Sequence, residues 1–161
     1  MDSRGDEIND TKALTVRRMS ASDASPAYSI LEESPEASTW SRESLQESVR
    51  QGVAWAAELD GRVAGILIGR VAGDEFDILN LAVGKACRRR GVATQLVSVA
   101  LEYARTAGAL QVYLEVRASN EGAIAFYMRM GFRVCGRRPN YYRNPVEDAV
   151  LLVLHNDGTK L

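Results

Sequence analysis

Three apolar runs joined by tight-turn sequences restrict the middle of this chain to an antiparallel β-meander. Val53–Glu58 leads into Asp60-Gly61, a dipeptide typical of two-residue hairpin turns, and the chain returns over Arg62–Val71. Ala72–Asp74, with its central glycine, turns the chain again into a third predicted strand, Glu75–Val83. Strict alternation predicts two faces for this third strand: Phe76, Ile78, Asn80 and Ala82 on one, and Asp77, Leu79, Leu81 and Val83 on the other.

Two helices are predicted before the meander. Asp23 can cap the first, which leaves Pro26 in the tolerated first turn. Ser41 begins the second, where Trp40 and Leu45 have the spacing of a hydrophobic staple.

Two more helices are predicted after the meander. One runs from about Val92 to Thr106 and stops at Gly108. The next begins at Asn120, a good N-cap, and ends at Gly131, a good residue to follow a helix. The longer helix has an apolar stripe formed by Val92, Leu96, Val99, Ala100 and Tyr103.

The remaining short apolar runs are predicted to be strands: Leu14–Arg18, Gln111–Val116, Phe132–Arg138 and Ala149–Leu154. The resulting order, β-α-α-β-β-β-α-β-α-β-β, indicates an α+β fold around one central sheet. A length of 161 residues predicts a single domain, which we assign to residues 13–155. We expect the polar ends, 1–12 and 156–161, to be flexible tails.

Charge and composition argue against several classes of function. The formal net charge is −1, so no overall basic excess indicates a nucleic-acid partner. The two cysteines, Cys87 and Cys135, and the single His155 form no metal-ligand pattern, and we expect reduced thiols in a cytoplasmic protein. The N-terminus has no signal-peptide pattern, and no apolar run reaches about 18 residues, so no membrane span is predicted.

A basic loop containing a glycine precedes the long predicted helix. It spans Arg88–Ala93 with the sequence RRRGVA. A helix N-terminus attracts phosphate through its free N–H groups and dipole, and Gly91 would let the backbone approach a ligand closely. The sequence therefore predicts a pyrophosphate cradle, although a solvated basic turn fits the spacing equally well. Neither a Walker loop nor a Rossmann fingerprint is present.

Two residues beyond this loop could transfer protons. Glu115 lies in an apolar strand, and we predict a general base whose pKa burial has raised; the alternative is a salt bridge, for example with Arg117. Tyr127 lies near the end of the last predicted helix, and its phenol, with a pKa of about 10, could protonate a thiolate whose conjugate acid has a pKa of about 8.5. The alternative for Tyr127 is a core tyrosine. Taken singly, each structural alternative is the commoner case.

Together, these segments supply what aminolysis of a thioester requires. That reaction needs an anion cradle, a base, an acid and hydrogen-bond donors for the carbonyl oxygen. The donors could come from backbone N–H groups of the third meander strand, at Leu81, Ala82 and Val83.

This combination resembles the acetyltransferases of the GNAT superfamily. Arg88, Gly91 and Ala93 match the family signature Q/R-x-x-G-x-G/A. A second family motif, N-x-x-A-x-x-x-Y-x-x-x-G-F, is present as Asn120, Ala123, Tyr127, Gly131 and Phe132. The likeness extends over about residues 14–154. It implies the GNAT fold, a mixed and mostly antiparallel sheet of about seven strands flanked by four helices.

Further segments resemble one group of this family, the bacterial RimI enzymes, which acetylate the N-terminal alanine of a small-subunit ribosomal protein. They are Trp40-Ser41, Leu114–Asn120, Arg137–Tyr142 and Glu147–Ala149. The implied acceptor is therefore the N-terminus of a ribosomal or other protein. Two features depart from the family pattern. Ala93 replaces the more usual glycine, and Gly84–Cys87 lacks the aspartate, proline and aromatic residue often found before this loop.

The resemblance implies acetyl-CoA as the cosubstrate and no metal. The backbone of Leu81, Ala82 and Val83 would bind the pantetheine arm and thioester, and Asn120 would contact the arm near the reacting centre. The pyrophosphate would be held by Arg88, Arg89, Arg90, Gly91, Val92, Ala93 and Thr94.

The resemblance also assigns catalytic and acceptor residues. Glu115 would be the base, acting through water, and Tyr127 would be the acid. Tyr141 and Tyr142 would shape the slot for the acceptor peptide. Two other functions stay open: acetyl transfer to a lysine side chain or small-molecule amine, and a catalytically silent CoA-binding module. A pure binding module needs neither Glu115 nor Tyr127.

Overall fold

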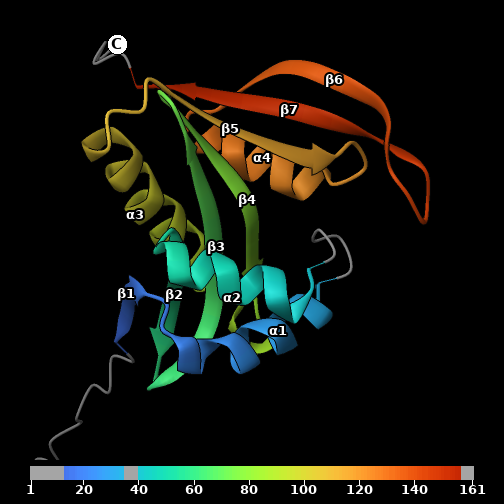
Figure 1. The fold of residues 1–161 in the computed structure, drawn as a ribbon. Helices are drawn as coiled ribbons and strands as arrows, with labels where there is room; N and C mark the ends of the chain where they lie inside the picture. Colours follow the sequence, from blue (N-terminus) through green and yellow to red (C-terminus); the bar gives the residue numbers. More distant parts are fainter. Residues whose placement is uncertain (1–12, 35–39, 157–161) are drawn as a thin grey trace, which may run out of the picture.

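The computed structural model describes residues 13–34 and 40–156, and within these ranges it contains a seven-stranded sheet and four α-helices (Figure 1). The predicted order of strands and helices is confirmed. The strands are β1 (Leu14–Arg18), β2 (Ala54–Leu59), β3 (Arg62–Ala72), β4 (Glu75–Val83), β5 (Gln111–Arg117), β6 (Arg133–Tyr142) and β7 (Glu147–His155). The helices are α1 (Ala24–Glu32), α2 (Arg42–Gln51), α3 (Val92–Thr106) and α4 (Glu121–Arg129), with short 3-10 turns η1 (Ala21–Asp23) and η2 (Lys85–Cys87). Of the predicted tails, 1–12 and 156–161, only Asn156 lies within the described residues, and its backbone N–H donates to the Leu110 carbonyl.

The sheet is mixed and mostly antiparallel, as expected. Its strand order is β1-β2-β3-β4-β5-β7-β6, and β4 and β5 form a parallel pair within it. The hairpin turn predicted at Asp60-Gly61 joins β2 to β3, and both residues have the positive φ angles that this turn requires. β6 and β7 form a long hairpin at the edge of the sheet opposite β1 (Figure 1).

Helices cover both faces of the sheet (Figure 1). α1 and α2 pack on one face against a cluster that includes Ala56, Ile66 and Ile68. α3 and α4 pack on the opposite face over a larger cluster that includes Phe76. None of the helices in the described ranges is both long and apolar enough to cross a membrane.

The buried face of α3 differs in part from the predicted stripe. Val92, Leu96 and Ala100 are buried as predicted. Val97 and Ala104 are also buried, whereas the predicted Val99 and Tyr103 are only partly buried at the edge of the cluster.

A β-bulge in β4 overturns the predicted alternation of its side chains. Ile68 of β3 is paired with Asn80 and the next residue, Gly69, with Ile78, so Leu79 is an extra residue in β4. Phe76 and Ile78 therefore lie on the α3 face, whereas Ala82 lies on the α1 and α2 face. Gly69 permits the packing beside the bulge, because a Cβ there would overlap the Phe76 ring.

Capping residues position the helices largely as predicted. The Ser41 hydroxyl accepts a hydrogen bond from the Ser44 N–H at 3.1 Å, and Trp40 packs against the same cluster as Leu45. Gly131 follows α4 with a φ of +102°. The last hairpin is longer than predicted, since β6 extends to Tyr142 and β7 starts at Glu147.

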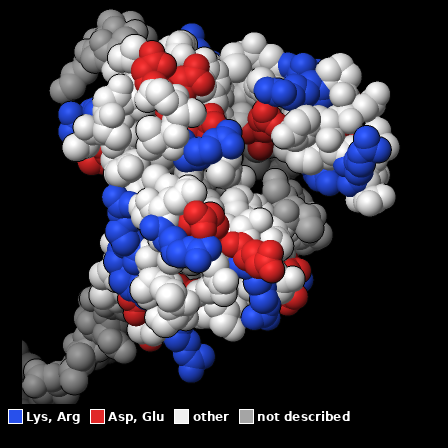
Figure 2. Space-filling model, in the orientation of Figure 1, with Lys and Arg blue, Asp and Glu red and all other residues white. Residues whose placement is uncertain are grey.

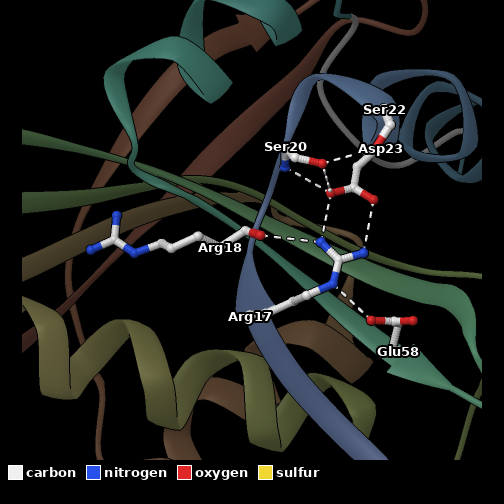
Figure 3. A network of polar contacts seen from close by, with 6 residues as sticks. All are labelled: Arg17, Arg18, Ser20, Ser22, Asp23 and Glu58. Atoms are coloured by element: carbon white, nitrogen blue, oxygen red, sulfur yellow. Dashed lines mark hydrogen bonds and ion pairs between the residues drawn. The ribbon is translucent and has the colours of Figure 1, made fainter.

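Asp23 does not cap α1 with its side chain, contrary to the prediction. Its carboxylate instead accepts two hydrogen bonds from the Arg17 guanidinium, at 2.7 and 2.9 Å, and one from the Ser20 N–H (Figure 3). Arg17 also donates to Glu58 of β2 at 2.7 Å. The network joins β1, β2 and the entry to α1, and the Arg17 guanidinium holds the pKa of the Asp23 carboxyl at about 2.

We predict that Asp23→Asn lowers the free energy of unfolding by about 2 kcal/mol at pH 7. Because the folded-state pKa lies below the ordinary 3.8, this stabilisation is present above pH 5 and is lost as the pH falls towards 2. Urea unfolding at several pH values measures both effects, and the variant should show a weaker dependence on pH. As a control, Glu47→Gln breaks an exposed ion pair with Arg50 and should change stability by at most about 0.5 kcal/mol. Equal losses in the two variants would contradict the role of Asp23.

Candidate active site

β4 and β5 part in the middle of the sheet. Their parallel pairing begins at Glu75 and Gln111 and ends at Ile78 and Leu114, immediately before the bulge. Beyond this point a cavity of about 150 Å³ lies between the strands. It is lined by β4 from Ile78 to Val83, β5 from Leu114 to Arg117, and Ser34, Arg88, Asn120, Ala123, Tyr127 and Tyr142.

The hydrogen-bond ladder between β3 and β4 fixes which backbone groups of β4 point away from β3. The Gly84 N–H donates to the Ala64 carbonyl at 2.8 Å, so the backbone of Ala82, two residues earlier, also points towards β3. The backbone groups of Leu81 and Val83 point the opposite way, towards the cavity. The Val83 carbonyl already accepts a hydrogen bond from Arg88 Nε at 3.4 Å.

Tyr127 forms part of the cavity wall from the side of α4. Its side chain is buried, with its ring in edge contact with Phe126 and Phe132. Burial raises the pKa of the phenol, so Tyr127 keeps its proton throughout the neutral range. Asn120 lies at the start of the same helix, where its side-chain oxygen accepts a hydrogen bond from the Ala123 N–H at 3.2 Å. The predicted N-cap is therefore confirmed, and the same residue lines the cavity.

Glu115 is half-buried and paired, but not with Arg117. Its carboxylate contacts Arg138 Nε at 3.1 Å, and 27% of its side chain stays exposed. The Tyr141 hydroxyl hydrogen-bonds to the same carboxylate, which raises the pKa of Tyr141. Arg117 instead pairs with Glu147 of β7 at 3.3 Å and lies over the Tyr142 ring. The pairing of β5 with β7 brings Glu147 to Arg117, an arrangement that the local sequence around Glu115 does not indicate.

A second, larger cavity of about 660 Å³ shares part of this wall. Five residues line both cavities: Ile78, Leu79, Leu114, Glu115 and Tyr142. The larger one is also lined by Trp40, Ser44, Glu75, Asp77, Tyr113, Arg138, Tyr141 and Leu151. Figure 2 shows the surface hollowed between the β6–β7 hairpin and the helices α1 and α2.

Sequence patterns missed several residues of these two cavities. Ser44 and Tyr113 were not predicted to be functional, and Trp40 was predicted only as a packing residue and a point of family likeness. Arg138 belongs to a segment that resembles a family motif. Its contact with Glu115 of β5 depends on the position of β6 in the sheet, with β7 between the two strands.

The predicted phosphate loop leads into an uncapped helix. Gly91 precedes α3 with a φ of +78°, which explains the glycine, and a Cβ there would meet nothing within 4 Å. The first backbone hydrogen bond of α3 runs from the Gln95 N–H to the Gly91 carbonyl. The N–H groups of Val92, Ala93 and Thr94 therefore have no acceptor within the helix, and no acidic residue lies in this first turn.

The other residues of the loop differ in their relation to the cavity. Arg88 lines the smaller cavity. The next two residues, Arg89 and Arg90, are exposed and do not line it. Arg89 has a positive φ of 63°. Among residues 13–34 and 40–156, no group of three or more His, Cys, Asp or Glu side chains could hold a metal ion.

Comparison with known proteins identifies the family. Residues 18–132 match the family model described as the acetyltransferase (GNAT) family. The chain is 30% identical to the ribosomal protein bS18-alanine N-acetyltransferase of Escherichia coli K12 over 143 aligned residues. This alignment covers 87% of this chain and 96% of the E. coli enzyme.

Solved structures agree with the sequence relatives. The crystal structure of the E. coli ribosomal-protein-S18-alanine N-acetyltransferase superposes with a TM-score of 0.79 at 28% identity, over 92% of this chain and 100% of that one. Ard1 from Thermoplasma volcanium gives a TM-score of 0.83 at 29% identity, over 89% and 97% of the two chains. The predicted GNAT fold is confirmed, and the chain belongs to the acetyltransferase (GNAT) family as an N-acetyltransferase.

Proposed function

We propose that this N-acetyltransferase transfers the acetyl group of acetyl-CoA to the α-amine of a protein N-terminus. The observation that carries the proposal is the position of Glu115 in the wall of two cavities. One lies between the parted strands β4 and β5, and the other is an open groove large enough for several residues of a peptide. The relative in E. coli indicates the N-terminal alanine of a ribosomal protein as the acceptor, which would give the enzyme a cytoplasmic role.

The smaller cavity and the start of α3 suit acetyl-CoA. We assign the pantetheine arm to the backbone of Leu81 and Val83, since the Ala82 backbone is turned towards β3. The pyrophosphate would bind the N–H groups of Val92–Thr94, with Arg88–Gly91 contributing charge and a close backbone approach. The Asn120 oxygen caps α4, so its amide nitrogen is the group that would contact the arm.

Glu115 and Tyr127 would carry the proton transfers. The bound thioester supplies the acetyl group. Glu115 would take a proton from the acceptor amine, directly or through water, so that the nitrogen lone pair can attack the carbonyl carbon. The Val83 N–H would polarise the carbonyl oxygen. As the carbon–sulfur bond breaks, Tyr127 would donate its proton to the departing thiolate, which suits a phenol that burial keeps protonated.

The choice of an α-amine follows from acid–base chemistry. An α-amino group has a pKa of about 7.7–8.0, so roughly a fifth to a third is neutral near pH 7.4. A lysine amine, with a pKa of about 10.4, is only ~0.1% neutral there. The difference corresponds to about 3.5 kcal/mol of deprotonation, which a single carboxylate base supplies poorly. Tyr141 and Tyr142 line the groove next to Glu115 and would flank the first residues of the peptide.

We predict that the enzyme releases free thiol from acetyl-CoA in the presence of an alanine-starting peptide that copies the N-terminus of the ribosomal protein. The control peptide has a blocked N-terminus and an added lysine. Turnover on the free terminus alone supports the proposal. Turnover on the lysine peptide, or on neither peptide, would reject the α-amine acceptor and direct attention to lysine or small-molecule amines.

We predict that Glu115→Gln lowers kcat/KM at pH 7 by about 10²-fold or more, because the amide cannot accept a proton. The affinity for CoA, measured by calorimetry, should stay unchanged. Glu121→Gln is the matched control, since Glu121 lies in the first turn of α4 outside the lining of both cavities. Near-normal kcat/KM in Glu115→Gln would remove Glu115 from the role of base.

We predict that Tyr127→Phe lowers kcat by about 10²-fold while the KM for acetyl-CoA stays within a small factor of normal. The substitution keeps the buried ring and its aromatic contacts, so folding should be preserved. Tyr103→Phe provides the control, because Tyr103 packs against Trp55 away from both cavities. Steady-state kinetics on both variants tests the assignment, and equal kcat values would rule out Tyr127 as the acid.

A further inference from the structure

The proposed base, Glu115, already forms an ion pair with an arginine of the protein, Arg138. Arg138 Nε lies 3.1 Å from Glu115 Oε1. Arg138 lines the larger cavity but not the smaller one, so its guanidinium reaches the carboxylate from the acceptor side. An acceptor ammonium must approach Glu115 from this same side.

The guanidinium and an acceptor ammonium would compete for Glu115. Once the ammonium hydrogen-bonds to the carboxylate, the two positive charges would lie only a few ångströms apart, and their repulsion in a half-buried groove is substantial. The ammonium must then give its proton to a Glu115 oxygen, which leaves a neutral amine with a free lone pair. A guanidinium that stays on the same carboxylate opposes this proton transfer.

Arg138 is free to leave Glu115 at little cost. Its side chain is 56% exposed, and exposed ion pairs contribute little to stability. The register of β6 with β7 shifts between Arg138 and Tyr142, so Arg138 is the last regularly paired residue of β6 before this irregularity. The guanidinium already lies over the Tyr141 ring, 5.7 Å from the ring centre, and this contact does not depend on the ion pair with Glu115.

We propose that Arg138 is a positioning residue that holds the place of the acceptor ammonium on Glu115 and is displaced when the acceptor binds. The inference rests on the proposed role of Glu115. It makes acceptor binding an exchange of one cation for another, and the low pKa of an α-ammonium then lets it pass its proton to Glu115 more readily than a lysine would. A blocked N-terminus has no charge with which to displace Arg138.

Arg137 provides a matched control in the adjacent position. Its Nε lies 3.1 Å from Asp148 Oδ2, and its side chain is 60% exposed, so its ion pair closely resembles that of Arg138. Arg137 lines neither cavity. Any general effect of removing an arginine from β6 should therefore occur in both variants.

The test measures the Kd of the alanine-starting peptide for the CoA-bound enzyme by calorimetry. We predict that Arg138→Ala lowers this Kd about two- to fivefold, the factor expected for loss of a competing exposed ion pair, and that Arg137→Ala leaves it unchanged. The Kd of an N-acetylated peptide should not change in either variant.

An unchanged or higher Kd in Arg138→Ala would overturn the inference, as would equal changes for the free and blocked peptides. This outcome is distinct from failure of the proposed function. The proposed acceptor fails when the wild-type enzyme does not acetylate the peptide, whereas the displacement of Arg138 fails on the binding comparison alone.

Discussion

The loss of pairing between β4 and β5 is the constraint on which the candidate active site depends. Seven strands that paired along their whole length would leave no room for a ligand inside the sheet. Here the parallel pairing ends at Ile78 and Leu114, and the bulge at Leu79 marks the point of separation. The parted strands expose backbone groups of β4 on one side and Glu115 on the other, and α4 brings Tyr127 to the same cavity.

Local signals were enough to predict most of the fold. Ser41 and Asn120 cap their helices through side-chain hydrogen bonds, and Gly131 ends α4 with a positive φ, as residue type and spacing indicate. The family resemblance added the site. Residues far apart in the sequence, including Arg88, Glu115 and Tyr127, were predicted to act together, and they line one cavity.

What the sequence could not predict depends on partners from distant strands. The bulge arises where β3 pairs with β4 and the Phe76 ring covers Gly69. The sequence of β4 alone therefore does not indicate the bulge. Asp23 has the right residue type for a helix cap, but its carboxylate accepts hydrogen bonds from the Arg17 guanidinium and the Ser20 N–H instead of from the N–H groups of α1. Glu115 pairs with Arg138 rather than Arg117 because β7 and β6 bring other charges alongside β5.

The most direct test of the account is residue-resolved amide hydrogen exchange with and without CoA. We predict slower exchange for the N–H groups of Leu81 and Val83 and for Val92–Thr94 at the start of α3 when CoA is added. The Ala82 N–H, already directed to β3, should change little. Protection of Ala82 in place of its neighbours, or protection confined to another part of the sheet, would contradict a CoA site between the parted strands.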